Sequence, residues 1–256
     1  SIGMTASGLL QASFLVWGLK RAGVRLRIFR PKLTPGVKRL FVLGVPGMIS
    51  AGITHINIMV SHFISTFQEG APSWLYYSDR LYQLPLGIIG IAMGSALLPA
   101  LSRRLRAGDE QGALTSMNRA IEIAAYLTLP AAIALAVMPD FLVGGLFERG
   151  EFTASDTAQT AKALMMFAFG LPAFVLLKVL TPAFFARENT KTPMMYAAIS
   201  AMINLGVGAY LFFKVGFFGL ALATSIAAWG NGLYLALDLR SEAYVVTDER
   251  LRKRKK

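Results

Sequence analysis

The class of fold is decided by the stretch from Ser73 to Ser102, SWLYYSDRLYQLPLGIIGIAMGSALLPALS. Its only charged residues are Asp79 and Arg80, and the apolar run after them is long enough to cross the ~30 Å hydrocarbon core of a bilayer as a helix. Similar runs predict spans near residues 1–19, 40–67, 74–101, 120–147, 160–186, 193–213 and 217–237. The sequence therefore predicts an all-α, polytopic integral membrane protein with about seven transmembrane helices.

The composition of the 256 residues agrees with this class. Hydrophobic residues make up 55% of the chain and charged residues only 16%, whereas about a quarter of the residues in an average soluble domain are charged. The chain has no cysteine, which excludes disulfides, thiolate metal sites and thiol nucleophiles. The sequence also shows no pattern typical of a catalytic triad, a metal site or a glycine-rich phosphate loop. We therefore expect neither an enzyme nor a metal site.

The positive charges indicate which side of the membrane each gap faces. Most of the 26 Lys and Arg residues lie in every second gap, within segments 20–39, 103–119, 187–191 and 240–256. The positive-inside rule places these gaps in the cytoplasm, with the N-terminus outside and the tail inside. The net charge of +12 also allows nucleic-acid binding, but topology and the anionic inner leaflet explain it. We expect membrane lipids and no nucleic acid as partners.

Ionisable side chains at membrane depth are costly, which makes them functional candidates. Asp79 and Gln83 are four residues apart and share a helix face, while Arg80 lies about 100° around and suits bidentate binding of a phosphate. The alternative is an interfacial Asp79/Arg80 pair beneath a belt of aromatic residues. Lys178 either contacts an anion in a cavity or extends to the inner interface. His55 lines a cavity, forms a hydrogen bond to another helix or couples to protons.

Three stretches carry a resemblance to a known family. They are Ser73 to Ser102, Phe147 to Thr153 with Asp156, and Lys178 to Pro182 with Lys191 to Pro193. In this order they resemble the MurJ/MviN family, the lipid II flippases of bacterial cell-wall synthesis. The resemblance implies the multidrug/oligosaccharidyl-lipid/polysaccharide (MOP) exporter fold, in which two helical lobes surround a cationic cavity and work by alternating access.

The resemblance also suggests how the chain is divided. It covers roughly the sixth to twelfth transmembrane helices of the family, and the chain opens with Ser1 inside an apolar run, which is typical of a fragment end and not of a signal peptide. Residues 1–39 would then be the last helix of the N-terminal lobe with a basic cytoplasmic linker. Residues 40–240 would form the six-helix core of the C-terminal lobe, and residues 241–256 a basic cytoplasmic tail. A naturally short protein is the alternative.

By the same resemblance, Arg80 matches a cavity arginine that contacts a diphosphate. Ser73 and Asp79 match polar residues required in the same helix. Gln83 stands where the family often has a glutamate, which removes one charge from the predicted site. These residues and Lys178 form the predicted substrate-binding set.

A cation-coupling site is a further implication of the family. Some members bind sodium in the C-terminal lobe, and Asn204 and Thr224 match two of the ligands, while Gly208 stands where a carboxylate is expected. A hard cation prefers several oxygen ligands, including charged ones. Coupling to Na+ at Asn204 and Thr224, or to H+ at His55, is therefore an open expectation, and no other cofactor is expected.

The resemblance implies that the complete protein moves lipid II, the undecaprenyl-diphosphate-linked peptidoglycan precursor, from the inner to the outer leaflet of the bacterial inner membrane. Two alternatives remain at this point. One is an exporter of drugs or of another lipid-linked polysaccharide in the same superfamily, and the other is a membrane scaffold that transports nothing. Proteins of cell-wall synthesis and division are further expected partners.

Overall fold

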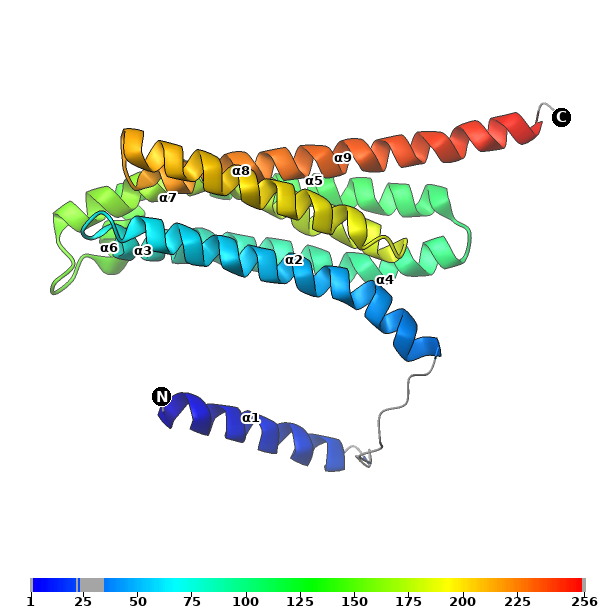
Figure 1. Ribbon diagram of the computed structural model, residues 1–256, viewed down its shortest axis with the longest axis horizontal. Helices are drawn as coiled ribbons and strands as arrows, with labels where there is room; N and C mark the ends of the chain where they lie inside the picture. The colour runs from blue at the N-terminus through cyan, green and yellow to red at the C-terminus, as the bar shows by residue number, and fades with distance from the viewer. Residues whose placement is uncertain (1, 22, 24–34, 255–256) are drawn as a thin grey trace. The chain divides into compact units, whose positions relative to one another are not determined.

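The computed structural model describes residues 2–21, 23 and 35–254 (Figure 1). The regular structure in these residues is helical and includes no strand, which confirms the all-α prediction. The elements are α1 (Ile2–Arg21), α2 (Pro35–Ser65), α3 (Ala71–Pro85), the π-helix η1 (Leu86–Ile91), α4 (Ala92–Arg106), α5 (Glu110–Val137), α6 (Pro139–Phe147), α7 (Ala154–Ala186), α8 (Lys191–Val215) and α9 (Phe218–Arg254).

Within the part that the structure describes, five helical stretches are long and apolar enough to cross a membrane. They are Ala71–Arg106, Glu110–Val137, Ala154–Ala186, Lys191–Val215 and Phe218–Arg240. They correspond to the last five predicted spans. The first two predicted spans fall on helices α1 and α2, and the total of about seven spans stays a prediction.

The predicted boundaries of the fourth span, 120–147, are wrong. Helix α5 begins earlier, because the Asp109 side chain accepts a 2.8 Å hydrogen bond from the backbone N–H of Gly112 and so caps the helix. The same helix ends earlier, since Met138 adopts φ −125° and ψ 43°, outside the helical region. Pro139 then opens the short helix α6, so the apolar residues 139–147 are not the end of the span.

Contacts divide the chain into two units, Ser1–Leu40 and Phe41–Lys256. The first unit contains α1, whose described side chains are nearly all exposed. The second unit contains the greater part of α2 and all the helices that follow. Residues 241–254, predicted as a basic tail, continue helix α9. The assignment of these segments to two lobes and a cytoplasmic tail stays a prediction.

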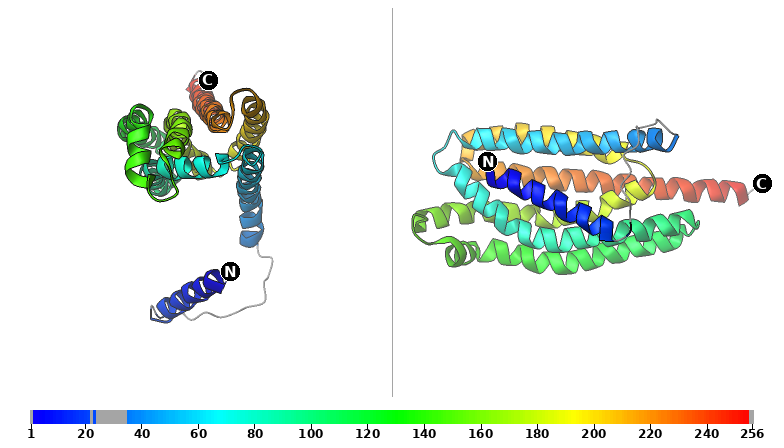
Figure 2. Two further views of the ribbon diagram at one scale, coloured as in Figure 1. Left: turned by 90° about the vertical axis from the view of Figure 1, so that its left-hand side faces the viewer. Right: turned by 90° about the horizontal axis from the view of Figure 1, so that it is seen from below.

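Helix α7 is the centre of the second unit, and it packs against α9, α5, α3 and α4. Figure 2 shows the helices of this unit from the end and from below, running alongside one another. Small residues bring α7 and α9 close together, because the Ser225 hydroxyl donates a 2.6 Å hydrogen bond to the carbonyl of Met166, beside Gly170. A Cβ atom on Gly170 would lie only 2.8 Å from Cβ of Ser225.

The connections alternate between the two ends of this unit (Figure 1). Segments 66–70, 138–153 and 216–217 connect helices at one end, and 107–109 and 187–190 connect them at the other. The second end carries a group of basic residues, which comprises Arg103, Arg104, Arg106, Arg187 and Lys191. The structure therefore gathers at one end the charges that the positive-inside rule assigns to the cytoplasm.

Candidate functional site

The polar face of α3 carries four of the five predicted substrate-binding residues. The helix begins after Gly70, whose φ of 79° is left-handed and favours glycine, and Pro72 lies in its first turn. Trp74 fixes this end, because its indole Nε1–H donates a 2.8 Å hydrogen bond to Oδ1 of Asp156 at the start of α7. Its ring also lies 5.0 Å from the ring of Phe217, between α8 and α9. This end of α3 is thus held by the first turn of α7 and by the connection between α8 and α9.

Along this face, Asp79 and Gln83 contact each other directly. The side-chain amide of Gln83 donates a hydrogen bond to Oδ2 of Asp79, which confirms that the two residues share a helix face. Asp79 is half-buried, and Gln83 and Ser73 are exposed. The carboxylate of Asp79 is therefore occupied by a neutral donor on its own helix.

Arg80 contacts an aromatic ring, and the choice between a cavity residue and an interfacial pair with Asp79 stays open. Its guanidinium carbon lies 4.8 Å from the centre of the Tyr76 ring, one turn earlier on the same exposed stripe. No salt bridge joins Arg80 to a carboxylate in the described part of the chain. A guanidinium that rests on an aromatic ring with its N–H donors available is suited to grip a phosphate bidentately. Sequence reasoning missed Tyr76 as this partner, although the spacing of four residues is a usable signal.

Lys178 belongs to another helix, α7, and it packs against the span of α3 beyond Pro85. The helix widens there into the π-helix η1, which includes Gly90, and a Cβ atom on Gly90 would lie 3.1 Å from Cγ of Lys178. Gly90 is ten residues beyond Arg80, or about 15 Å along a helix at 1.5 Å per residue. The Lys178 side chain is exposed. The structure therefore separates Lys178 from the other four candidates.

A second polar group joins α2, α8 and α9. The side-chain N–H2 of Asn204 donates hydrogen bonds to Oδ1 of Asn57 and to Oγ1 of Thr224, both at 3.2 Å. The structure thus brings together Asn204 and Thr224, the two residues predicted for cation coupling. We call Asn57, Asn204 and Thr224 the amide bridge. Asn57 was missed in the sequence, because nothing local distinguishes it from other polar residues in spans.

His55 is not part of the amide bridge. It is exposed, and it lies two residues before Asn57, which corresponds to about 200° around α2. Gly208 does lie beside the bridge, because its Cβ position would be 3.5 Å from Oδ1 of Asn204. The bridge does not fit a sodium ion, since its three side chains are neutral and two of their oxygens accept hydrogen bonds from an amide.

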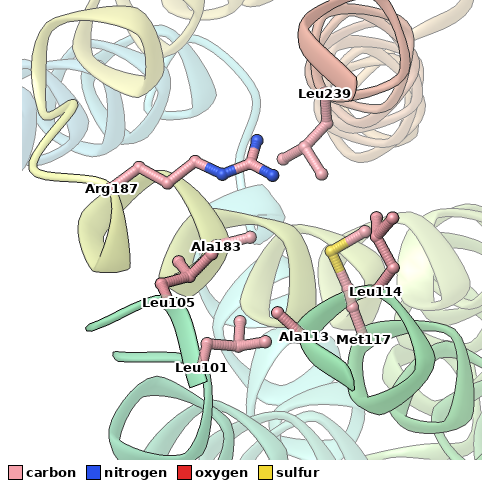
Figure 3. Close-up of a pocket in the computed structure, with 8 residues that line it drawn as sticks. All are labelled: Leu101, Leu105, Ala113, Leu114, Met117, Ala183, Arg187 and Leu239. Atoms are coloured by element: carbon pink, nitrogen blue, oxygen red, sulfur yellow. The ribbon is translucent and has the colours of Figure 1, made fainter. Parts of the chain in front are cut away.

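The structure also has a small apolar notch that the sequence did not predict, at the basic end of the second unit (Figure 3). Side chains of α4, α5, α7 and α9 line it, and Arg187 extends across its rim toward Leu239. It contains none of the predicted site residues. The notch therefore belongs to the packing of the helix ends and not to the polar face of α3.

Solved structures similar to this one define the class of protein. A lipid II flippase MurJ in an inward closed conformation matches with a TM-score of 0.71 at 27% identity, over 82% of this chain and 45% of that one. An outward-facing multidrug resistance MATE transporter of the MOP superfamily matches with a TM-score of 0.70 at 17% identity, over 82% and 48% of the two chains, which shows the fold alone. The chain has the fold of MOP-type, multi-pass membrane transporters.

The sequence comparisons specify the family. The family model described as lipid II flippase MurJ matches residues 1–253. A probable lipid II flippase MurJ of Rhizobium meliloti (strain 1021) is 46% identical over 235 residues, which are 92% of this chain and 44% of the relative. The chain therefore belongs to the lipid II flippase MurJ family, a family of transporters and not of enzymes, and it spans about half the length of the curated relatives it matches.

Proposed function

We propose that this chain is part of a transporter that moves lipid II from the inner to the outer leaflet of the bacterial inner membrane by alternating access. Family membership supports this proposal, and the observation that carries it is the guanidinium of Arg80, which lies on the ring of Tyr76 within a span and has no carboxylate bonded to it among the described residues. Transport makes and breaks no covalent bond, so the residues act only by binding the cargo and by changing position.

The physical obstacle is the polar headgroup of the cargo. Sugars, a peptide and a diphosphate cannot enter hydrocarbon without losing hydrogen bonds to water, and each buried, unpaired polar group costs about 2–7 kcal/mol. Arg80 replaces part of that hydration by contacting the diphosphate through paired N–H donors. The lipid tail stays in the bilayer throughout. The cavity thus needs positive charge where the phosphates pass.

The other candidates take supporting roles. Asp79 and Gln83 form one hydrogen-bonded unit beside Arg80, and this unit limits the positions that a bound headgroup can take. Ser73, exposed one turn before Tyr76, supplies a hydroxyl to the sugar or peptide. Lys178 of α7 packs beside Gly90, about 15 Å along the span from Arg80, and is a second cation for the diphosphate in another stage of the cycle.

The membrane potential supplies a driving force for a cationic cavity, because about 2.3 kcal/mol is available per charge per 100 mV. A proton-coupled cycle would require a titrating group, and His55 is the candidate for it. The basic end of the unit faces the cytoplasm and the anionic lipids of the inner leaflet. Proteins of cell-wall synthesis and division are the partners expected for a transporter that delivers their substrate.

The test is rescue of cells depleted of their own lipid II flippase by the complete open reading frame that contains this sequence. We expect rescue by the parent and by Arg119→Ala, which removes an exposed arginine of α5, and no rescue by Arg80→Ala at equal expression in the membrane. Arg80→Lys keeps the charge without the planar fork, so it should rescue weakly.

Each other outcome identifies an error. Rescue by Arg80→Ala would remove Arg80 from the cargo site while leaving the function in place. Failure of the inserted parent would reject lipid II as the cargo and favour the drug-export or scaffold alternative. Binding of another diphosphate lipid that depends on Arg80 would then favour export of a different lipid-linked polysaccharide, and no such binding would favour the other two alternatives.

A further inference from the structure

The amide bridge connects three helices through one side chain. Asn204 belongs to α8 and is 6% exposed, and its amide N–H2 reaches Asn57 of α2 and Thr224 of α9 at 3.2 Å each. The Asn57 side chain reaches back to α8, because its Nδ2 donates a 3.0 Å hydrogen bond to the carbonyl of Ala201. The Thr224 hydroxyl donates a 2.8 Å hydrogen bond to the carbonyl of Leu220. The Thr224 hydroxyl thus uses its only proton within α9, and Asn57 presents its side-chain oxygen to Asn204.

These outer hydrogen bonds determine how the amide of Asn204 is oriented. Since Asn57 uses its N–H2 on Ala201 and Thr224 uses its O–H on Leu220, both present acceptor oxygens to Asn204. Only the N–H2 end of Asn204 can satisfy two acceptors. Its Oδ1 must then point the other way, where it is buried without a described hydrogen-bond partner, next to Gly208.

The orientation of the Asn204 amide places a hydrogen-bond donor where a cation would need oxygen ligands. A cation between these helices would need Oδ1 of Asn57, Oγ1 of Thr224 and Oδ1 of Asn204 to face one centre. In this chain two of those oxygens face a hydrogen-bond donor, and the third faces away from them. Gly208 contributes no side chain that could add the missing negative charge. The N–H2 group of Asn204 therefore occupies the position that a cation would need.

We propose that Asn204 replaces a cation in this chain, so that its amide joins α2, α8 and α9 and the transport cycle is not coupled to sodium at this place. This inference rests on the proposed transport function, but not on which lipid is carried. The bridge holds the three helices in one arrangement. A conformational change that moves α2 relative to α8 therefore breaks the hydrogen bonds of Asn57, whereas in a sodium-coupled protein it would release an ion.

The test compares the thermal stability of the complete protein, purified in detergent, in sodium chloride and in potassium chloride at equal ionic strength. We expect the same unfolding midpoint for the parent in both salts. Asn204→Asp replaces the donor by an oxygen of the same shape, so three oxygens then converge, and sodium should raise its midpoint specifically. Asn231→Asp is the matched control, because Asn231 of α9 is another amide with a buried oxygen but lies outside the bridge, and sodium should not raise its midpoint.

A second variant covers the case in which Asn204→Asp fails to fold. Gly208→Asp leaves the three bonded groups in place and adds a carboxylate next to the unpaired Oδ1 of Asn204. These oxygens offer a cation a position on the other side of the amide from the N–H2 group, so this variant too should acquire a sodium-specific rise. A sodium-specific rise in the parent that Thr224→Ala abolishes would overturn the proposal, as would variants that gain no sodium response although folded. These readouts need no cargo, so a wrong assignment of the cargo would not change them.

Discussion

The hydrogen bond between Trp74 and Asp156 gives a prediction whose size follows from the structure. The bond is 2.8 Å long and its acceptor is a carboxylate, so it is in the charge-assisted class. Trp74→Phe removes the N–H donor and keeps an aromatic ring against Phe217. Hydrogen bonds to charged groups contribute about 1.5–3 kcal/mol, and because both side chains are partly exposed we expect a loss of about 1.5 kcal/mol. This corresponds to a fall of about 3–6 °C in the unfolding midpoint for a unit of this size.

The matched control is Trp229→Phe. Trp229 also donates from its indole nitrogen to another helix, but its acceptor is the neutral backbone carbonyl of Phe169 at 3.0 Å. A neutral bond contributes about 0.5–1.5 kcal/mol, so the control should lose less stability than Trp74→Phe. The assay is heating of the complete protein in detergent, followed by size-exclusion chromatography to measure the fraction that remains monodisperse.

A double-mutant cycle separates the bond from other effects of the substitution. Asp156→Asn leaves one oxygen for the hydrogen bonds that Thr153 donates to Oδ2, and it replaces the oxygen that accepts from Trp74 by an N–H2 group, which cannot accept. If the reasoning is right, Trp74→Phe should cost less in the Asp156→Asn background than in the parent. Equal costs in both backgrounds, or a loss no larger than that of the Trp229→Phe control, would refute it.

Two further predictions concern packing and the polar face. Gly170→Ala should lower the free energy of unfolding by about 1–3 kcal/mol, because its methyl group would overlap Ser225. Gly206→Ala should be tolerated, since no atom lies within 4 Å of its Cβ position. Equal unfolding midpoints for the two variants would show that α7 and α9 are not packed this tightly. Tyr76→Leu should weaken binding of a diphosphate lipid about 2–5-fold, since the ring contributes about 0.5–1 kcal/mol to holding Arg80. Tyr76→Phe keeps the ring and should bind as the parent does. Equal binding by the parent and both variants would mean that the ring does not position Arg80.

The spans were predictable because their signal is local and long. About 20 apolar residues suffice to cross a bilayer, and charges mark the ends, as in Ala154–Ala186 and Phe218–Arg240. The predicted fourth span ends about ten residues after α5 does, because apolar residues resume directly after Pro139 and Asp140. The pair Pro139 and Asp140 after Met138 is a helix-start signal that hydropathy alone does not detect.

The polar face of α3 was predictable to the extent that it depends on spacing within one helix. Asp79 and Gln83 share a face because they are four residues apart, and the structure pairs them. The rest of the predicted site depends on other helices. Lys178 lies near Gly90 because of how α7 crosses η1, and no pattern in either segment indicates the level of that crossing.

The sequence did not predict the contacts between side chains that determine how the helices cross. Trp74 and Asp156 are 82 residues apart, and Asn57 and Asn204 are 147 apart. In water, burying an apolar stripe would fix the rotation of each helix, but lipid is as apolar as the core, so this preference disappears within a bilayer. Polar side chains keep a strong preference, because an unpaired amide in hydrocarbon is costly. Asn57, Asn204 and Thr224 therefore help to fix the rotations of α2, α8 and α9 about their axes, together with Ser225 and Trp229 of α9, which bond to α7. We expect a change in any of the three bridge residues to alter how α2 and α8 pack.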